Sequence, residues 1–319
     1  MENAAEVYRP SGQMGRGLVM FPLFGIVTAL ALGIAYGYLN VYNPLVYLQA
    51  LAMIFYAVAL GYVVAKTMVW SNCRNTAFVS IMALLTGLFA LYFAWAAFTC
   101  ALLEKNNVAG VSLWKCLLSP DGIWTFASLV ATTGWFQVFS ATPSGIVLWL
   151  FWLVEAAVIV GGTVLIAHGE AKKRVFCEDC LKWCAVKKDL ARFTATTREQ
   201  VAERLKAGEL EALLELQPAY AKLGVFFEVE HQLCPKCGNF GTYQIRKVTT
   251  ARDKEGKETK NSEDLTANLL LSRERTEKLG LVLAHSKSAP KKAPAAAAKP
   301  AAGAKTAAPS DEAPPAQES

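Results

Sequence analysis

The chain has 319 residues, 54% of them hydrophobic, and a formal net charge of +6 at pH 7. A chain of this length accommodates two domains, and its hydrophobic content is typical of a membrane protein. The positive charge comes mainly from a basic stretch after residue 169 and from a lysine-rich tail, which favours contact with a membrane surface and argues against a nucleic-acid partner.

The N-terminal half is almost free of charge. Only seven charged residues lie between Gly17 and Gly169, whereas charges of both signs are dense from Glu170 onward. We expect residues 1–17 to form a cytosolic N-terminal segment and residues 18–169 to form a membrane domain. Each of its four long apolar stretches is long enough to cross about 30 Å of hydrocarbon at about 1.5 Å per residue. The four predicted spans are residues 18–39, 46–69, 77–103 and 146–167.

A fifth uncharged stretch, residues 123–139, is predicted not to cross the membrane. It is short for a span, is interrupted by Gly134 and is rich in Thr, Ser and Trp. A segment of this length and composition is typical of a helix that lies along the interface or re-enters the membrane.

The distribution of Lys and Arg predicts the orientation of the spans. Basic residues precede the first span, lie between the second and third, and follow the fourth, whereas the loop after the first span has no charge. This asymmetry places both termini in the cytoplasm. The candidate contacts for lipid headgroups are Arg74, Lys172, Lys173 and Arg174. Arg74 is alternatively a contact point for the cytosolic domain.

Small residues recur in the first and fourth spans, as Gly33-x-x-x-Gly37 and Gly161-Gly162. Because lipid provides no hydrophobic drive between helices, small residues that permit a close approach favour packing. The pattern predicts close helix packing within the chain, with a dimer interface as the alternative.

Glu155 is the acidic residue predicted to lie inside the hydrocarbon, in the fourth span. A carboxyl at this depth is costly unless it is protonated or faces a polar group of the bundle. Two roles are open: a hydrogen bond that locks the fourth span to the bundle, and a relay for a proton or cation. The candidate partners are Tyr36, Asn40, Asn43, Gln49 and Tyr92.

Residues 170–284 are predicted to form a cytosolic α+β domain. Thr197-x-x-Gln200 resembles a capping box at the start of a helix that ends at Gly208, and a second short helix is predicted in GELEALLEL. Two β-rich runs, residues 225–233 and 242–251, flank CPKCGNFG. They predict a hairpin with cysteines at its tip.

The C-terminal part is predicted in two pieces. Residues 262–279 are charged and amphipathic, which predicts a last helix. Residues 285–319 are rich in Ala, Pro and Lys and poor in large apolar side chains, which predicts a disordered tail.

Two C-x-x-C pairs give the strongest indication of a site: Cys177-Glu-Asp-Cys180 and Cys234-Pro-Lys-Cys237. Four thiolates are the tetrahedral donor set that a structural zinc prefers, and Gly238 permits the tight turn after the second pair. Zinc is therefore the expected cofactor, and iron in a rubredoxin-like site uses the same four thiolates. A thioredoxin-like redox pair is disfavoured, because neither pair lies in a βαβ context.

The remaining cysteine of this region, Cys184, is predicted to be a thiol packed beside Trp183, with a substitute metal ligand as the alternative. Thiols clustered in this way argue for a reducing compartment. Four cysteine ligands leave no open coordination position, so the metal is expected to be structural. The sequence also has no phosphate-binding loop and no metalloprotease motif, and no catalytic residues are predicted.

Several runs of this sequence are distinctive in combination. They are YNPLVYLQAL, the Arg74-Asn75 turn, GLFALYFAW, the Pro120 segment that ends in Gly134-Trp135, LWLFWLVEAAVIV and FCEDCLKW. Together they resemble a group of uncharacterised bacterial multi-pass membrane proteins with a cytosolic C-x-x-C zinc-ribbon-like domain. The resemblance covers roughly residues 39–237 and implies the same architecture.

The predicted fold class is an all-α membrane domain, a four-helix transmembrane bundle, followed by a small α+β zinc-ribbon domain and a disordered tail. We expect a non-enzymatic docking or scaffold protein whose partners are the lipid bilayer and a cytosolic protein bound through the ribbon. The alternative is a small transporter or channel component in which Glu155 is the ion-coupling group.

Overall fold

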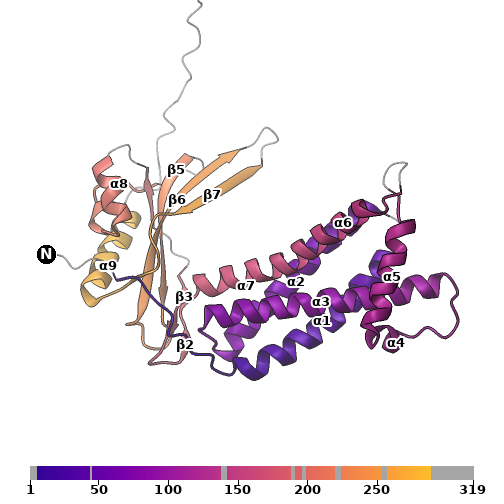
Figure 1. Cartoon of the computed structure of the whole chain (residues 1–319). Coiled ribbons are helices and arrows are strands. Elements are labelled where there is room, and N and C mark those ends of the chain that lie inside the picture. The colour runs from indigo at the N-terminus through magenta and orange to yellow at the C-terminus, as the bar shows by residue number, and fades with distance from the viewer. Residues whose placement is uncertain are drawn as a thin grey trace, which may run out of the picture.

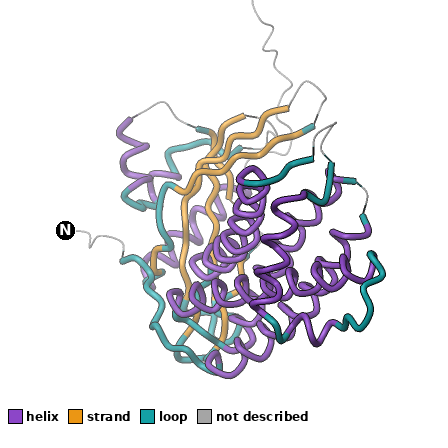
Figure 2. The backbone as a smooth tube through the Cα atoms, turned by 45° about the vertical axis from the view of Figure 1, so that its right-hand side comes forward, coloured by secondary structure: helices purple, strands orange, loops and turns teal. Residues whose placement is uncertain are grey.

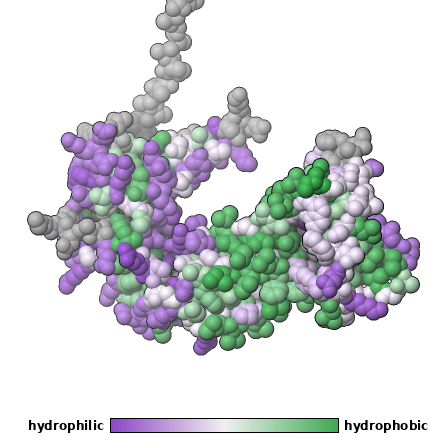
Figure 3. Space-filling view, viewed as in Figure 1, coloured by the Kyte–Doolittle hydropathy of each residue, from purple (hydrophilic) through white to green (hydrophobic). Residues whose placement is uncertain are grey.

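A computed structural model describes residues 6–43, 45–137, 142–187, 191–195, 199–219, 224–252 and 257–288. An elongated helical bundle extends from one side of a domain built on an antiparallel sheet (Figure 1). Hydrophobic side chains cover much of the bundle on the face shown in Figure 3, and hydrophilic side chains cover much of the sheet domain. The division between an apolar and a charged half of the sequence is therefore also a division in space.

Four long helices form the bundle. They are α1 (Gly17–Tyr42), α2 (Val46–Ser71), α3 (Thr76–Lys105) and a continuous fourth helix made of α6 (Ile146–Ala156), a π-helical turn η1 (Ala157–Gly161) and α7 (Gly162–Lys173). Among the described residues, these four are the helices long and apolar enough to cross a membrane. The four apolar helices predicted from the sequence are confirmed, each a few residues longer than predicted.

The glycines of the first span lie where α1 packs against α3. A Cβ atom added to Gly37 would lie 2.5 Å from the Ala94 carbonyl oxygen, and one added to Gly33 would lie 2.9 Å from Cβ of Phe93. A Cβ atom added to Gly162 would lie 3.1 Å from Cβ of Ala57 in α2, whereas one added to Gly161 would meet no described atom within 4 Å. The predicted packing of small residues within the chain is confirmed, except at Gly161.

Two short helices, α4 (Leu113–Leu117) and α5 (Pro120–Thr133), lie at the end of the bundle away from the sheet domain (Figure 1). The Ser119 hydroxyl accepts a hydrogen bond from the Gly122 amide at the start of α5, and Gly134 with φ of 73° ends it. A helix of 14 residues is about 21 Å long, too short to cross the hydrocarbon. The described part of the 123–139 segment is thus too short to cross, as predicted, and its position at the interface stays a prediction.

The sheet domain is a curled antiparallel sheet covered on one face by helices. Its strands are β3 (Ala185–Val186), β4 (Ala191–Thr194), β5 (Gly224–Leu233), β6 (Gly241–Arg252), β7 (Glu258–Asp264) and β8 (Leu269–Leu270). The long pair β5 and β6 forms the predicted hairpin, and β3 and β4 both pair with β5 while β7 and β8 both pair with β6. A separate two-stranded ribbon pairs β1 (Phe176–Cys177) with β2 (Lys182–Trp183).

The helices α8 (Glu199–Lys206) and α9 (Arg273–Ser288), with a 3-10 turn at Glu211–Leu213, cover the face of the sheet that points away from the bundle. Figure 2 shows the same order from another side, with the strands between these helices and the bundle. The core beneath the helices has large side chains from every layer, including Phe193, Leu205, Leu213, Phe227, Tyr243, Ile245 and Val282.

Two predictions for this domain need correction. Residues 262–279 are not one helix, because 262–264 complete β7, Leu269–Leu270 form β8, and the helix begins at Arg273. The second short helix is only the 3-10 turn. The last helix, α9, continues to Ser288, past the domain boundary expected at residue 284. Thr197 of the capping box and residues 289–319 of the predicted tail lie outside the described residues.

Candidate functional site

The four cysteines of the two C-x-x-C pairs meet at one point of the sheet domain. Their sulfur atoms all lie within 4.8 Å of one another. One pair comes from the β1–β2 turn, where Cys177 is paired with Lys182. The other comes from the β5–β6 hairpin, where Cys234 lies directly after β5. The two pairs, which are far apart in the sequence, are thus brought together by folding, and the group is able to bind one metal ion.

Backbone geometry fixes the second turn. The Gly238 amide donates to the Cys234 carbonyl oxygen (3.0 Å), and the Cys234 amide donates to the Phe240 carbonyl oxygen (2.8 Å). Gly238 has φ of 68°, a left-handed conformation in which a side chain is strained. In the first turn Leu181 takes the comparable conformation with φ of 54°. The two turns therefore position the four sulfur atoms.

The four thiols do not share one electrostatic environment. The backbone N–H of Cys237, followed by that of Lys236, lowers the pKa of Cys234 to about 6, because these groups donate to its thiolate. Burial raises the pKa of Cys177. Cys234 is therefore the first of these two thiols to lose its proton as the pH rises. A metal that binds here would displace the proton of Cys177.

Cys184 lies close to this group without belonging to it. Its amide donates to the Val175 carbonyl oxygen (2.8 Å). Burial, together with the nearby Cys234 and Cys177 sulfur atoms, raises the pKa of Cys184 to about 12. Cys184 is thus a neutral thiol that is only half-buried, whereas the sequence predicted a buried thiol packed beside Trp183.

Arg74 connects the first cysteine pair to the bundle. It lies in the α2–α3 turn, which Asn72 (φ of 51°) and the N-cap Asn75 shape. Its side chain is only 5% exposed, and its Nε lies 3.4 Å from the carboxylate of Glu178, between the two cysteines of the first pair. The guanidinium also lies 4.3 Å from the centre of the Phe176 ring. Of the two roles predicted for Arg74, the structure favours the contact with the cytosolic domain, because the buried side chain is not available to headgroups.

Further hydrogen bonds strengthen this junction. The indole Nε1 of Trp183 donates to the Val69 carbonyl oxygen of α2 (3.0 Å), and the Gln232 side-chain amide donates to the Lys173 carbonyl oxygen of α7 (2.9 Å). Lys172 and Lys173 are exposed at the end of α7, while Arg174 pairs with Glu170 (3.5 Å). The sheet domain therefore contacts the ends of α2 and α7, and Lys172 and Lys173 are exposed beside this contact.

The N-terminal segment is the part of this junction that the sequence did not predict. Val7 forms a β-bridge with Leu269 at the edge of the sheet, and the Tyr8 hydroxyl accepts from the Phe176 amide (3.1 Å). Further along, the Arg74 amide donates to the Gln13 carbonyl oxygen (2.7 Å). The segment thus links the sheet to the bundle, and the short polar run 6–16 has no periodicity that reveals it.

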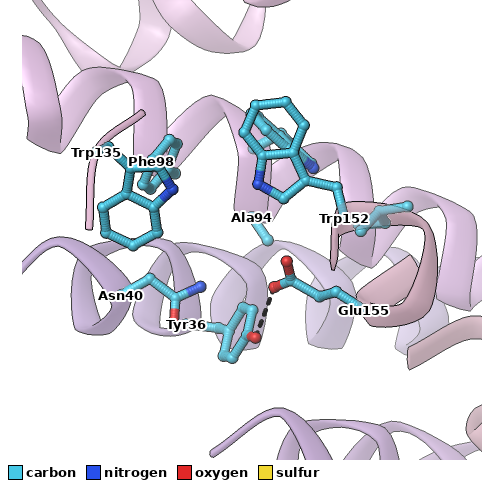
Figure 4. A pocket seen from close by; sticks show the side chains of 9 residues that line it. Tyr36, Asn40, Ala94, Phe98, Trp135, Trp152 and Glu155 are labelled. Carbon is cyan, nitrogen blue, oxygen red and sulfur yellow. Dashed lines mark hydrogen bonds between the residues drawn. The ribbon is translucent and has the colours of Figure 1, made fainter. Parts of the chain in front are cut away.

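Glu155 lies inside the bundle, opposite α1. The Tyr36 hydroxyl donates to its Oε1 over 2.6 Å, so one of the predicted partners is confirmed (Figure 4). Both residues line a cavity of about 30 Å³, together with Asn40 and a set of aromatic side chains. Three of the other four candidate partners bond elsewhere: Asn43 to the Leu45 carbonyl, Gln49 to the Asn40 carbonyl and Tyr92 to the Leu117 carbonyl.

No known protein family matches the chain, and neither a curated protein nor a solved structure shows detectable similarity to it. The geometry by itself defines the class. The chain is a protein with four helices able to span a membrane, joined to a domain whose group of four cysteines is able to bind a metal.

Proposed function

We propose that this chain is a membrane-anchored docking protein of the bacterial inner membrane, without enzymatic activity, whose metal-binding domain is a zinc ribbon that binds a cytosolic protein. The observation that supports it is that one side of the ribbon contacts the bundle while residues of both cysteine turns stay exposed. Glu178 of the first turn pairs with the buried Arg74, whereas Leu181 and Lys182 of the same turn and residues 235–239 of the second turn are exposed. The contact at Glu178 fixes the ribbon to the bundle and leaves the exposed residues for a partner.

The chemistry of the exposed surface indicates the kind of partner. Lys182 and Lys236 are exposed beside the metal group, and Leu181 is 61% exposed in the same turn as Lys182. Basic side chains around an apolar one are complementary to an acidic segment with an apolar residue. We therefore expect the cytosolic partner to present such a segment.

Site-specific crosslinking tests this docking function. A photoreactive amino acid replaces Lys236 in the full chain in bacterial membranes, and a control variant has it at Thr259, which is exposed on β7. We expect a discrete protein adduct from position 236 that disappears when Cys234→Ser removes a metal ligand. Equal adducts from both positions, or adducts to lipid alone, would refute the docking surface.

The same proposal includes the identity of the metal, the orientation in the membrane and the resemblance to a group of membrane proteins. Zinc suits a closed set of four thiolates, and an iron-loaded protein would be recognised by visible absorption that zinc does not have. Thiol labelling with a membrane-impermeant reagent, after a chelator has removed the metal, tests the orientation, since the exposed Cys237 then reacts only from the cytosolic side if both termini are cytosolic. The resemblance to multi-pass proteins with a C-x-x-C ribbon stays a prediction.

A second function, a transporter or channel component with Glu155 as its ion-coupling group, is favoured by one observation. Glu155 and Tyr36 bond at a cavity inside the bundle, where a carboxyl is costly without a role. Ion flux in vesicles reconstituted with the purified chain tests it. We expect a flux that Glu155→Gln abolishes, and a parent protein without flux would refute this second function.

A further inference from the structure

Four polar groups face the cavity beside Glu155. They belong to Glu155, Tyr36, Asn40 and Trp135. The residues come from three parts of the chain: α1, the segment after α5, and α6. Figure 4 shows the carboxyl and the hydroxyl pointing toward each other, with Asn40 and Trp135 to one side of them. A cavity of about 30 Å³ has room for about one or two water molecules.

Two polar atoms of the residues that line the cavity lack a hydrogen-bond partner in the described part of the chain. Oδ1 of Asn40 and Nε1 of Trp135 are both buried and have no hydrogen-bond partner among the described residues. Buried polar groups of proteins are nearly always bonded. Asn40 needs a donor here, while Trp135 needs an acceptor, because an indole nitrogen only donates.

Water meets both needs, since it donates and accepts at once. A metal cation cannot accept a hydrogen bond from Trp135, and it prefers about six or more oxygen ligands, whereas this cavity offers oxygen atoms from only three side chains. From this geometry we propose that the cavity binds water between Glu155, Asn40 and Trp135, and that Glu155 is a proton-binding site hydrated by it. The proposal deepens the second candidate function by naming the proton as the transported ion. It rests on that function only for the role of the proton in transport and not for its binding to Glu155.

Such water keeps both protonation states of Glu155 bonded. The ionised carboxylate accepts from Tyr36 and from water, whereas the protonated carboxyl still accepts from Tyr36 and donates to water. The titratable neighbours are tyrosines: Tyr36 itself and Tyr56 of α2, whose ring stacks on that of Tyr36 at 4.7 Å. The described residues of α3 that line the cavity, Leu91, Ala94, Trp95 and Phe98, do not titrate.

The cavity lies toward the end of the bundle opposite the ribbon. Glu155 follows the start of α6 by nine residues and Asn40 precedes the end of α1 by two, and both of those helix ends lie away from the sheet domain. Toward the ribbon, Tyr56, Leu60 and Ile159 pack as a buried apolar cluster. The proton is therefore expected to exchange with the membrane face opposite the ribbon.

Infrared difference spectroscopy of the full chain in phospholipid vesicles tests this site. The orientation of the protein in the vesicles is determined by labelling at Cys237. A step of pH outside the vesicles should then produce a C=O band of a protonated carboxyl, and Glu155→Gln should remove this band. The band should respond when the face opposite the ribbon is outside, and should shift on transfer to D₂O. Asn40→Leu should slow that shift by about tenfold, because it removes one bond to the water.

A matched control separates the water site from general loosening. Trp149→Phe removes another indole of the bundle that does not line this cavity, and should leave the exchange rate unchanged. The absence of a band sensitive to Glu155→Gln, or a band that follows sodium concentration in place of pH, would overturn the proposal. A Glu155 band without proton flux would support the site and refute only the transport function.

Discussion

Arg74→Ala tests whether the ribbon is fixed to the bundle. Three contacts of the side chain join the two parts: the Phe176 ring at 4.3 Å, the Glu178 carboxylate at 3.4 Å, and the amide oxygen of Gln13, to which the guanidinium donates. The substitution removes all three. Because Glu178 and Gln13 are exposed, water replaces the guanidinium at both, and no buried group is left without a partner.

The expected loss follows from these contacts. A desolvated cation–π contact contributes up to about 2 kcal/mol, a half-exposed ion pair about 0.5 kcal/mol, and a neutral acceptor bond about 1 kcal/mol. Since such terms overlap, we expect opening of the junction to become easier by about 2 kcal/mol. Arg74→Lys keeps the charge but loses the planar stacking, so about half of that loss is expected.

Hydrogen exchange measures this opening directly. A change of about 2 kcal/mol speeds the exchange of a protected amide about 30-fold if exchange follows local opening. The amide to follow is that of Phe176, which donates to the Tyr8 hydroxyl across the junction. Amides of the β5–β6 ladder should keep their rates.

Arg192→Ala provides a matched control. That arginine also contacts a ring, Phe226 at 5.2 Å, and an acid, Glu228 at 3.1 Å, but both lie within the sheet. It should leave the Phe176 amide unchanged. If Arg74→Ala changes that amide by less than about threefold, or if Arg192→Ala changes it equally, the inference that Arg74 fixes the ribbon is wrong.

Three further predictions concern the metal, the carboxyl and the helix packing. Cys234→Ser should release the metal and loosen the ribbon, as elemental analysis and circular dichroism would show. In the parent chain the metal affinity should fall as the pH falls toward about 6, because protons then compete at Cys234 as well as at the thiols of higher pKa. Glu155→Leu should lower the free energy of unfolding in detergent by about 1–2 kcal/mol, since the Tyr36 hydroxyl loses its acceptor, whereas Glu155→Gln should not; equal losses would contradict this. Gly37→Ala should destabilise the bundle by about 1–3 kcal/mol through its contact with the backbone of α3, while Gly161→Ala serves as a control without a described neighbour and should be tolerated.

Much of the architecture could be predicted because its causes are local in the sequence. Long apolar runs predict helices able to span a membrane, since hydrocarbon requires every backbone group to bond within its own segment. The two C-x-x-C pairs predict one group of four thiolates, because tetrahedral coordination needs both pairs. The pairing of Glu155 with Tyr36 was one of several possibilities, and its selection needed the tertiary arrangement that brings Tyr36 of α1 within hydrogen-bond distance of Glu155 in α6.

The sequence by itself determined the four apolar helices, the hairpin and the identity of the four thiols, because periodicity and spacing act over short stretches of chain. Only the tertiary structure decided that Arg74 is buried beside Glu178, that the segment containing Val7 joins the sheet edge, and that Trp135 faces the cavity of Glu155. Each of these contacts joins residues that lie on different elements and far apart in the sequence. Their partners are selected by the packing of whole elements, which no local pattern of residues records.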